Sequence, residues 1–310
     1  MSVDKANVNR WVSVSLLTLL SVFALLLLLQ FAATLFGPSK SACTKQVCLT
    51  RFLEGPPAFN NEVVAAYMRD NYFLPQAASE YRLSGHDGAS PTFNAMVEYI
   101  REYFKNKRGG VFVDLGAGDG EYRSLTLHLE KSLGWSGLLV EPNPKLYKRL
   151  LKKGRKAQLT KACVSPFSYP AKMDLSYPVL SEAVGEEEEI KQLGLAKLEQ
   201  LWPKETDTKR QKEGVQCIPL ENLVYAAGLN KPIDIFVLDM SGSDLDVLLN
   251  TKLDQIPDIQ MIVIHSNGAN MNNEIGGYFL ERNMVIKKVF GSNAEAATYI
   301  LVKFDARRDL

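Results

Sequence analysis

The segment from residue 109 to residue 153 constrains the fold of this chain more than any other part of the sequence. It opens with a short apolar run that ends in Asp114. Small residues follow in the loop, namely Gly116, Ala117, Gly118 and Gly120. Glycines at alternate positions form a tight turn and let a ligand approach the backbone without a Cβ in the way. The pattern therefore predicts a strand that runs into a ligand-binding loop.

The sequence after this loop is typical of the first half of a nucleotide-type binding site. Leucines at four-residue spacing in residues 121–133 predict a helix. A second apolar run, residues 138–140, then ends in Glu141, about 20 residues after the loop. An acid at this place in an α/β nucleotide-binding fold accepts hydrogen bonds from ribose hydroxyls.

The loop differs from a dinucleotide-binding fingerprint. That fingerprint needs a third glycine at position 121, where this chain has Glu121 in the pattern D-x-G-x-G-x-G. The carboxylates of Asp119 and Glu121 suit a ligand with a cationic amino-acid end better than a pyrophosphate. S-adenosylmethionine has such an end and a ribose, so we predict a Rossmann-type, methyltransferase-like domain. The alternative for a lone glycine loop is a plain tight turn, but here a helix, a second strand and an acid follow in register.

Strand and helix signals keep alternating toward the C-terminus. Apolar runs predict further strands at residues 157–164, 233–238 and 259–264, and a closing strand pair at 285–289 and 298–302. Helical patterns separate most of these runs. The alternation predicts an α/β fold with a mostly parallel sheet and helices on both faces.

Four polar side chains should meet at one edge of this sheet, because the carboxyl ends of parallel strands lie together and ligands bind there. They are Asp114, Glu141, Asp239 and His265, each at the end of a predicted strand. Asp244 lies near the start of the helix that follows Asp239 and is a further candidate.

Composition divides the chain into segments. We expect a short tail at 1–10, a transmembrane signal anchor at 11–36, a stem at 37–60, a helical cap at 61–108 and the methyltransferase-like domain at 109–304. Within this domain, residues 166–214 interrupt the alternation and are expected to form an insertion or long loop. The run of four glutamates at 186–189 is expected to be a solvated face.

The anchor prediction rests on a long stretch without charge. No charged side chain occurs between Arg10 and Lys40. As a helix, residues 11–36 would extend about 39 Å, enough for a hydrocarbon core of about 30 Å. A secretory signal peptide is the rival reading, but its apolar core is shorter. The flanking charges are nearly balanced, so orientation is weakly specified, and we favour a type II protein with a lumenal C-terminal domain in endoplasmic reticulum, Golgi or endosomal membranes.

Charge and cysteine content limit other functions. The net charge of +1 gives no electrostatic sign of nucleic-acid binding. Cys43 and Cys48 follow the predicted anchor, where a local disulfide, free thiols and intermolecular pairing all stay open. Cys163 and Cys217 lie in apolar strand-like segments and are expected to be small core residues. No metal site is predicted.

Several motifs in residues 109–303 resemble those of the FkbM-type methyltransferases. They are LGWSGLLVEPNP at 133–144, the Cys-x-Ser that ends at Ser165, CIPL at 217–220 and IDIFVLDMSGSDLDVL at 233–248. The apolar N-terminal stretch resembles the membrane-anchored branch related to the protein Star. The resemblance implies a Rossmann fold and an S-adenosylmethionine pocket, to which Asn143 and Ser165 would contribute. For the Star-like branch it implies a secretory-pathway membrane protein that takes part in the export of membrane-bound signalling ligands, and hence transmembrane cargo proteins as partners.

Two acids of the family pattern are replaced and a third is shortened. The family writes D-x-E-G-x-E after the fourth strand, whereas this chain has Ser241 in place of the first Glu and Asp244 in place of the second. A Glu is usual after the fifth strand, where this chain has His265. These changes favour a domain with weak or degenerate catalysis that acts in membrane trafficking. The alternative is an active O-methyltransferase in which Asp239 or His265 takes the proton of an acceptor hydroxyl.

Overall fold

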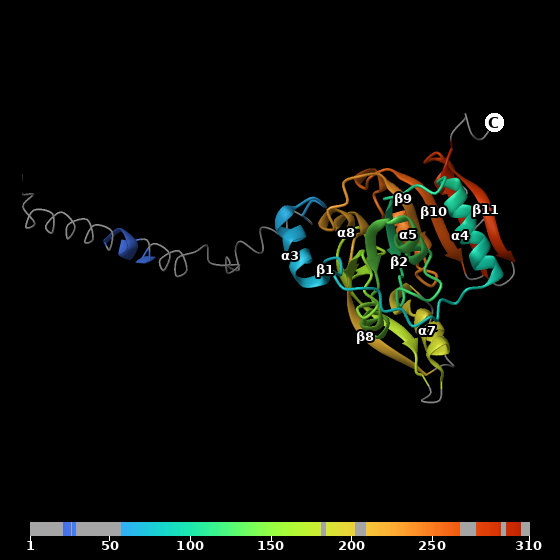
Figure 1. The fold of residues 1–310 in the computed structure, drawn as a ribbon, viewed down its shortest axis with the longest axis horizontal. Coiled ribbons are helices and arrows are strands. Elements are labelled where there is room, and N and C mark those ends of the chain that lie inside the picture. The colour runs from blue at the N-terminus through green and yellow to red at the C-terminus, as the bar shows by residue number, and fades with distance from the viewer. Residues whose placement is uncertain are drawn as a thin grey trace, which may run out of the picture. The chain divides into compact units, whose positions relative to one another are not determined.

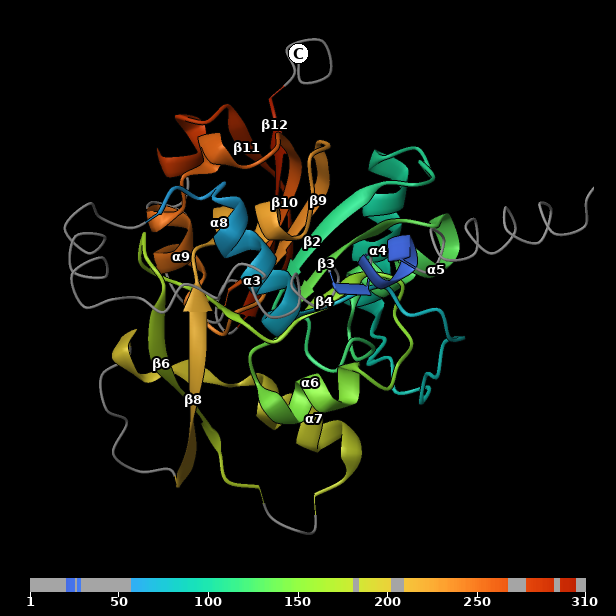
Figure 2. The same ribbon diagram turned by 90° about the vertical axis from the view of Figure 1, so that its left-hand side faces the viewer.

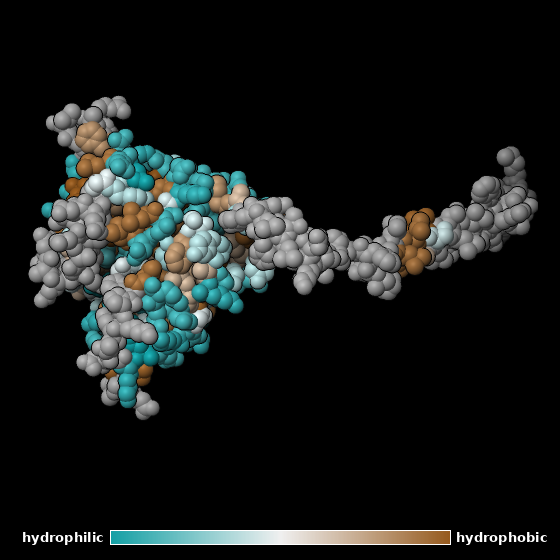
Figure 3. Space-filling model, turned by 180° about the vertical axis from the view of Figure 1, so that it is seen from behind, coloured by the Kyte–Doolittle hydropathy of each residue, from teal (hydrophilic) through white to brown (hydrophobic). Residues whose placement is uncertain are grey.

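The computed structural model describes residues 21–25, 27–28, 57–180, 184–201, 209–266, 277–292 and 296–304. The chain divides into two units, Met1–Pro56 and Pro57–Leu310. The described residues of the first unit are helical, and their apolar side chains are exposed, seen as the brown band in Figure 3. Among the described residues, no helix is long and apolar enough to span a bilayer. Most of the predicted anchor at 11–36 and of the stem at 37–60 lies outside these residues.

The second unit is built on a large mixed sheet, seen near its centre in Figure 1. Its strand order is β1 (Phe73–Leu74), β4 (Gln158–Thr160), β3 (Ser136–Val140), β2 (Val111–Leu115), β9 (Ile233–Leu238), β10 (Ile259–Ser266), β12 (Ala296–Lys303) and β11 (Met284–Ser292). The strands from β4 to β10 run parallel, while β1, β12 and β11 pair antiparallel. The central strands are buried on both faces, which is why they read as continuous apolar runs. The predicted closing pair is confirmed.

Helices cover both faces of this sheet, as predicted. The helices α3 (Glu62–Tyr72), α8 (Leu220–Ala226) and α9 (Asp244–Asn250) pack on one face, and α4 (Pro91–Tyr103), α5 (Leu125–Leu133) and α6 (Pro144–Leu150) on the other. Residues 61–108 do not form a single cap. Ala65 and Met68 of α3 join one apolar core, whereas Phe93, Met96 and Ile100 of α4 join the opposite one.

The segment 166–214, expected to be an insertion or a long loop, folds into most of a second sheet and is therefore a structured insertion. Its strand order is β5 (Cys163–Val164), β8 (Arg210–Ile218), β6 (Ala171–Pro178) and β7 (Lys197–Leu198), with α7 (Glu186–Gly194) and the short helix η1 (Glu199–Leu201) beside it. Buried Met173, Leu175 and Tyr177 alternate along β6. This alternation is the strand signal that the surrounding charged residues obscured. Figure 2 shows the second sheet with α7 next to α6.

A disulfide links Cys163 to Cys217. The two residues are register partners on the parallel strands β5 and β8, and both are buried. The prediction that they are core residues is therefore incomplete, because a single sequence does not show that two distant apolar strands will be neighbours. The covalent bond therefore joins two neighbouring strands of the second sheet, namely β5, which follows β4 in the chain, and β8.

A buried guanidinium holds the start of α5 in place. Arg155 is 1% exposed and forms an ion pair with Glu130 at 3.2 Å. It also donates hydrogen bonds to the Gly120 carbonyl at 2.7 Å, Ser124 Oγ at 3.2 Å and Thr126 Oγ1 at 3.1 Å. These contacts join the end of the glycine loop to the first turn and the middle of the helix.

We predict that Arg155→Met lowers the free energy of unfolding by about 3–5 kcal/mol, because it removes the cationic partner of the buried Glu130 carboxylate and the donor to the Gly120 carbonyl. Urea denaturation of the full-length chain in detergent measures this loss. Arg149→Met is the matched control, since Arg149 pairs with Glu186 and Glu189 at a partly exposed site and should cost about 0–1 kcal/mol. Equal losses in the two variants would contradict the prediction.

Candidate functional site

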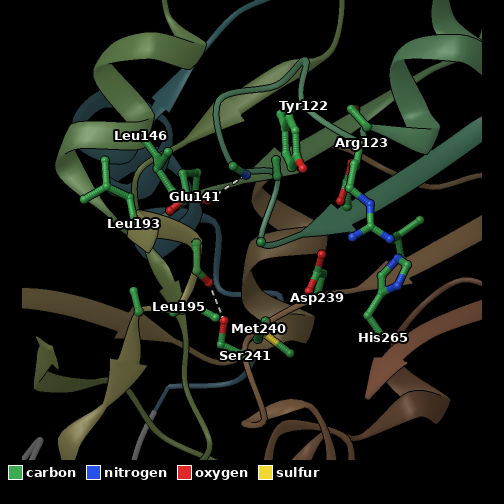
Figure 4. A pocket seen from close by; sticks show the side chains of 18 of the residues that line it. Tyr122, Arg123, Glu141, Leu146, Leu193, Leu195, Asp239, Met240, Ser241 and His265 are labelled. Carbon is green, nitrogen blue, oxygen red and sulfur yellow. Dashed lines mark hydrogen bonds between the residues drawn. The ribbon is translucent and has the colours of Figure 1, made fainter. Parts of the chain in front are cut away.

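A pocket of about 440 Å³ opens at the carboxyl edge of the large sheet, where the chain connections from β2 and β9 diverge. The predicted site residues that line it are Asp114, Gly116, Ala117, Gly118, Glu141, Asp239 and His265. Its volume lies in the range of about 300–1,000 Å³ that ligand pockets occupy. Figure 4 shows Glu141 on one side of the pocket and His265 on the other, with Asp239 between them.

Two glycines of the loop have different structural roles. Gly116 has φ +86°, and a Cβ there would lie 2.0 Å from the Asp239 carbonyl oxygen. It therefore allows β2 and β9 to approach at the bottom of the pocket. Gly118 has φ +60°, and a Cβ there would meet no atom within 4 Å. Its missing side chain leaves free space in the pocket wall, which a ligand can use.

Glu141 is held in place by backbone donors. Its Oε2 accepts a hydrogen bond from Gly118 N–H at 2.7 Å, drawn in Figure 4, and its Oε1 accepts one from Asn143 N–H at 2.7 Å. Burial raises the pKa of Glu141 to about 8. Each carboxylate oxygen keeps a second lone pair, so Glu141 can also accept from a ligand hydroxyl.

Asp114 lies at the bottom of the pocket and orients the turn. Its Oδ2 accepts a hydrogen bond from Thr126 Oγ1 at 2.6 Å, and burial raises its pKa to about 6. Because the same Thr126 hydroxyl accepts from Arg155, the strand-end acid belongs to the network that fixes α5.

The prediction that Asp119 and Glu121 face a cationic ligand is corrected for Glu121. Glu121 does not line the pocket; it pairs with Lys153 at 2.6 Å and accepts from the N–H groups of Ser84 and Gly85, both at 2.7 Å. Burial alone would raise its pKa, but these contacts outweigh burial and hold the pKa at about 2. Asp119 touches the pocket, yet its carboxylate accepts from the loop N–H of Tyr122 and pairs with Lys153 at 3.2 Å. The two acids, Asp119 and Glu121, thus hold the loop in place next to Lys153 and residues 84–85.

The three candidate catalytic residues are not equivalent. Asp239 is accessible from the pocket, and burial among the surrounding residues raises its pKa to about 6, an effect that Arg123 opposes. His265 Nδ1 lies 2.8 Å from Thr298 Oγ1, and burial together with Arg123 lowers its pKa to about 4. Asp244 lies outside the pocket lining and accepts from the N–H groups of its own loop. Asp239 is thus the acid with access to a ligand.

Three predicted cofactor residues lie outside the pocket lining. The hydroxyl of Ser165 donates to the Tyr169 carbonyl at 2.8 Å, and the side chain of Asn143 caps α6. A Cβ at Gly120 would lie 2.3 Å from Leu150. Direct ligand contact by these residues stays a prediction.

Sequence reasoning missed two features of the pocket. The first is an apolar wall beside Glu141, formed by Leu146, Ile190, Leu193, Leu195 and Leu198, most of which come from the segment taken for a loop. The spacing of Ile190 and Leu193 in α7 was its available signal. The second is Arg123, whose guanidinium reaches toward Asp239 and His265 in Figure 4. No local pattern marks it, because its direction depends on a backbone turn.

Glu141 should make the stability of the chain depend on pH. Its pKa is about 8 in the folded chain against 4.5 ordinarily, so the folded state holds more protons than the unfolded state between these values. We therefore expect the free energy of unfolding to fall as pH rises toward 8, by up to about 1.4 kcal/mol per pH unit, and to level off above 8. Denaturant titrations from pH 6.5 upward measure this pH dependence. Below that range the lowered pKa of His265 changes the free energy of unfolding in the opposite direction. The same slope in Glu141→Gln would contradict the prediction.

Solved structures give only distant similarities. An RNA methyltransferase structure from Pyrococcus horikoshii is 12% identical with TM-score 0.37, covering 79% of this chain and 100% of its own. TrmK of M. capricolum, solved with S-adenosylhomocysteine, is 15% identical with TM-score 0.34, covering 70% and 69%. A human methyltransferase 10 domain containing protein is 9% identical with TM-score 0.37, covering 80% and 97%. These scores are too low to support an argument.

The comparison with curated proteins finds no match. The comparison with family models does: the methyltransferase FkbM domain matches residues 114–297. This stretch begins at the acid that ends β2 and contains the glycine loop, Glu141, Asp239 and His265. Since it spans more than half of the chain, the protein belongs to the FkbM methyltransferase family.

Proposed function

We propose that this chain binds S-adenosylmethionine and transfers its methyl group to a hydroxyl acceptor. The observation that carries the proposal is the position of Asp239, which is exposed and shares one pocket with the glycine loop and Glu141. Membership of a methyltransferase family supports it. The altered acids at positions 241 and 265 leave this arrangement in place.

The cofactor half of the pocket fits the proposed group. The space at Gly118 admits the amino-acid end of the cofactor close to the backbone. Glu141 can accept from the ribose hydroxyls, and the apolar wall next to it suits a planar base. When bound, S-adenosylmethionine supplies a methyl group on a positively charged sulfur.

Asp239 is the proposed base. Its pKa of about 6 leaves it mostly ionised at neutral pH while keeping it basic enough to take a proton. Asp239 would accept the proton of the acceptor hydroxyl when that hydroxyl is methylated, and so leave a neutral ether product. His265, whose pKa is lowered to about 4, is neutral at this pH and serves as a hydrogen-bonding group at the acceptor side. Asp244 shapes the loop that carries Asp239.

A second candidate is a non-catalytic binding module in membrane trafficking, as in the Star-like branch. The replacement of two acids by Ser241 and His265 favours it. The Ser241 hydroxyl donates to the Gly194 carbonyl, which ties the Asp239 loop to α7 and not to a ligand (Figure 4). Methyl transfer by the unaltered chain would exclude this candidate.

We also propose a single-pass type II membrane location in the secretory pathway. The uncharged stretch at 11–36 supports it, as do the exposed apolar side chains of residues 22–28 that the structure describes. The disulfide between Cys163 and Cys217 supports an oxidising lumen around the folded domain.

Cofactor binding has a direct test. We expect the full-length chain in detergent to bind S-adenosylhomocysteine in a calorimetric titration. Gly118→Val should abolish binding because its branched side chain occupies the free space in the loop, and Glu141→Ala should weaken binding at least about tenfold by removing the carboxyl group that bonds the ribose hydroxyls. Unchanged affinity in Gly118→Val would mean that the pocket is misplaced.

Asp239→Asn is the matched variant for the same experiment. It should keep the affinity for S-adenosylhomocysteine within about twofold, since it removes charge only at the acceptor side. In an assay of labelled methyl transfer to a panel of hydroxyl compounds, it should lower the rate by about 10²–10⁴-fold. A variant that transfers methyl groups at the unaltered rate would exclude Asp239 as the base.

For the location, we expect the chain to stay in the membrane pellet after alkaline carbonate extraction and to be released by deletion of residues 11–36. In a Cys43→Ser/Cys48→Ser background, Cys163 and Cys217 should resist alkylation of the denatured chain until a reductant is added. Release of the intact chain by carbonate, or immediate alkylation, would contradict the membrane or the compartment proposal respectively.

A further inference from the structure

A cation, the guanidinium of Arg123, lies in the acceptor half of the pocket. The residues that line this half of the pocket are Thr92, Arg123, Asp239, His265, Phe290 and Thr298. Among the residues that the structure describes, none pairs with or accepts a hydrogen bond from the guanidinium of Arg123. Figure 4 shows the Arg123 guanidinium pointing into the pocket next to the His265 ring.

The backbone directs this side chain inward. Arg123 has φ +49°, a left-handed conformation that residues other than glycine seldom adopt. Two contacts hold it there: its own N–H donates to the Asp87 carbonyl at 2.7 Å, and the preceding Tyr122 N–H donates to Asp119 at 2.8 Å. Ser124, the next residue, caps α5. Contacts on both sides of Arg123 therefore hold this strained backbone conformation in place beside the pocket.

Other arginines of this domain form hydrogen bonds and ion pairs within the protein. Arg155 makes four polar contacts in the core, including the Glu130 pair. Arg210 donates to the hydroxyl and the carbonyl of Ser176. Arg149 pairs with two glutamates. Arg123 lines the pocket and makes no such bond to a described residue, so pairing within this part of the chain does not explain its position.

The groups around Arg123 do not neutralise it by direct contact. Asp239 and His265 respond to its charge: the guanidinium opposes the burial effect on the Asp239 pKa and adds to burial in lowering the His265 pKa. Neither forms an ion pair with it, although a guanidinium readily binds a carboxylate or phosphate through two parallel hydrogen bonds. The geometry leaves the charge available to a ligand.

We propose that the acceptor carries an anionic group, a carboxylate or a phosphate, that Arg123 binds while the reacting hydroxyl faces Asp239. The inference rests on the proposed function and names the substrate class of the same pocket. An anion on the acceptor would be repelled by ionised Asp239, and Arg123 offsets this repulsion. Arg123 thereby fixes which end of the acceptor reaches the base.

The test uses small probes in titrations followed by ligand-detected NMR. D-glycerate and glycerol 3-phosphate are compared with neutral glycerol, on the full-length chain in detergent, with and without S-adenosylhomocysteine. We expect the anionic probes to bind at least about tenfold more tightly than glycerol, and Arg123→Gln to remove that preference. The two anions separate a carboxylate site from a phosphate site.

Arg108→Gln is the matched control. It makes the same change of charge at an exposed arginine that precedes β2, at the opposite end of the strand from the pocket. It should leave the preference for anions intact. Equal binding of glycerol and both anions, or equal loss in both arginine variants, would overturn the proposal.

The two proposals fail separately. Binding of S-adenosylhomocysteine without any preference for anions overturns the role of Arg123 and leaves the cofactor site. Anion binding that depends on Arg123, in a chain that does not bind S-adenosylhomocysteine, overturns the methyltransferase proposal and supports the anion site. An unchanged affinity of Arg123→Gln for S-adenosylhomocysteine shows that the variant is folded.

Discussion

The buried guanidinium of Arg155 is the contact on which the pocket depends. It bonds the end of the glycine loop, the cap of α5 and Glu130 within that helix. Through Thr126 it also reaches Asp114, the acid at the end of β2. A buried charge of this kind is costly unless every donor has a partner. Satisfying it fixes the loop, and the loop in turn fixes the positions of Gly118 and Arg123.

The pocket divides chemically into two halves. On the side of Glu141, backbone donors and an apolar wall form a surface that suits a nucleoside. On the side of His265, charged and polar groups surround an accessible acid, Asp239. The second sheet contributes to the first half, and the antiparallel strands β11 and β12 contribute to the second. The parallel core therefore positions the loop, while the less regular parts of the domain provide the walls.

Replacing two acids of the family pattern changes contacts more than architecture. Ser241 bonds the backbone of α7, and His265 bonds Thr298 across the sheet. Both side chains join elements that frame the pocket. Asp239, which keeps the family residue, stays accessible from the pocket.

The sequence by itself determined the parallel core, the loop and the strand-end acids. Continuous apolar runs and alternate glycines are local signals, and parallel strands bring their carboxyl ends together whatever the details of packing. Only the tertiary structure decided that Glu121 faces Lys153, that Cys163 meets Cys217, that residues 166–214 wall the pocket and that Arg123 enters it. These features depend on which distant segments become neighbours and on single backbone angles, and neither leaves a periodic trace in the order of the residues.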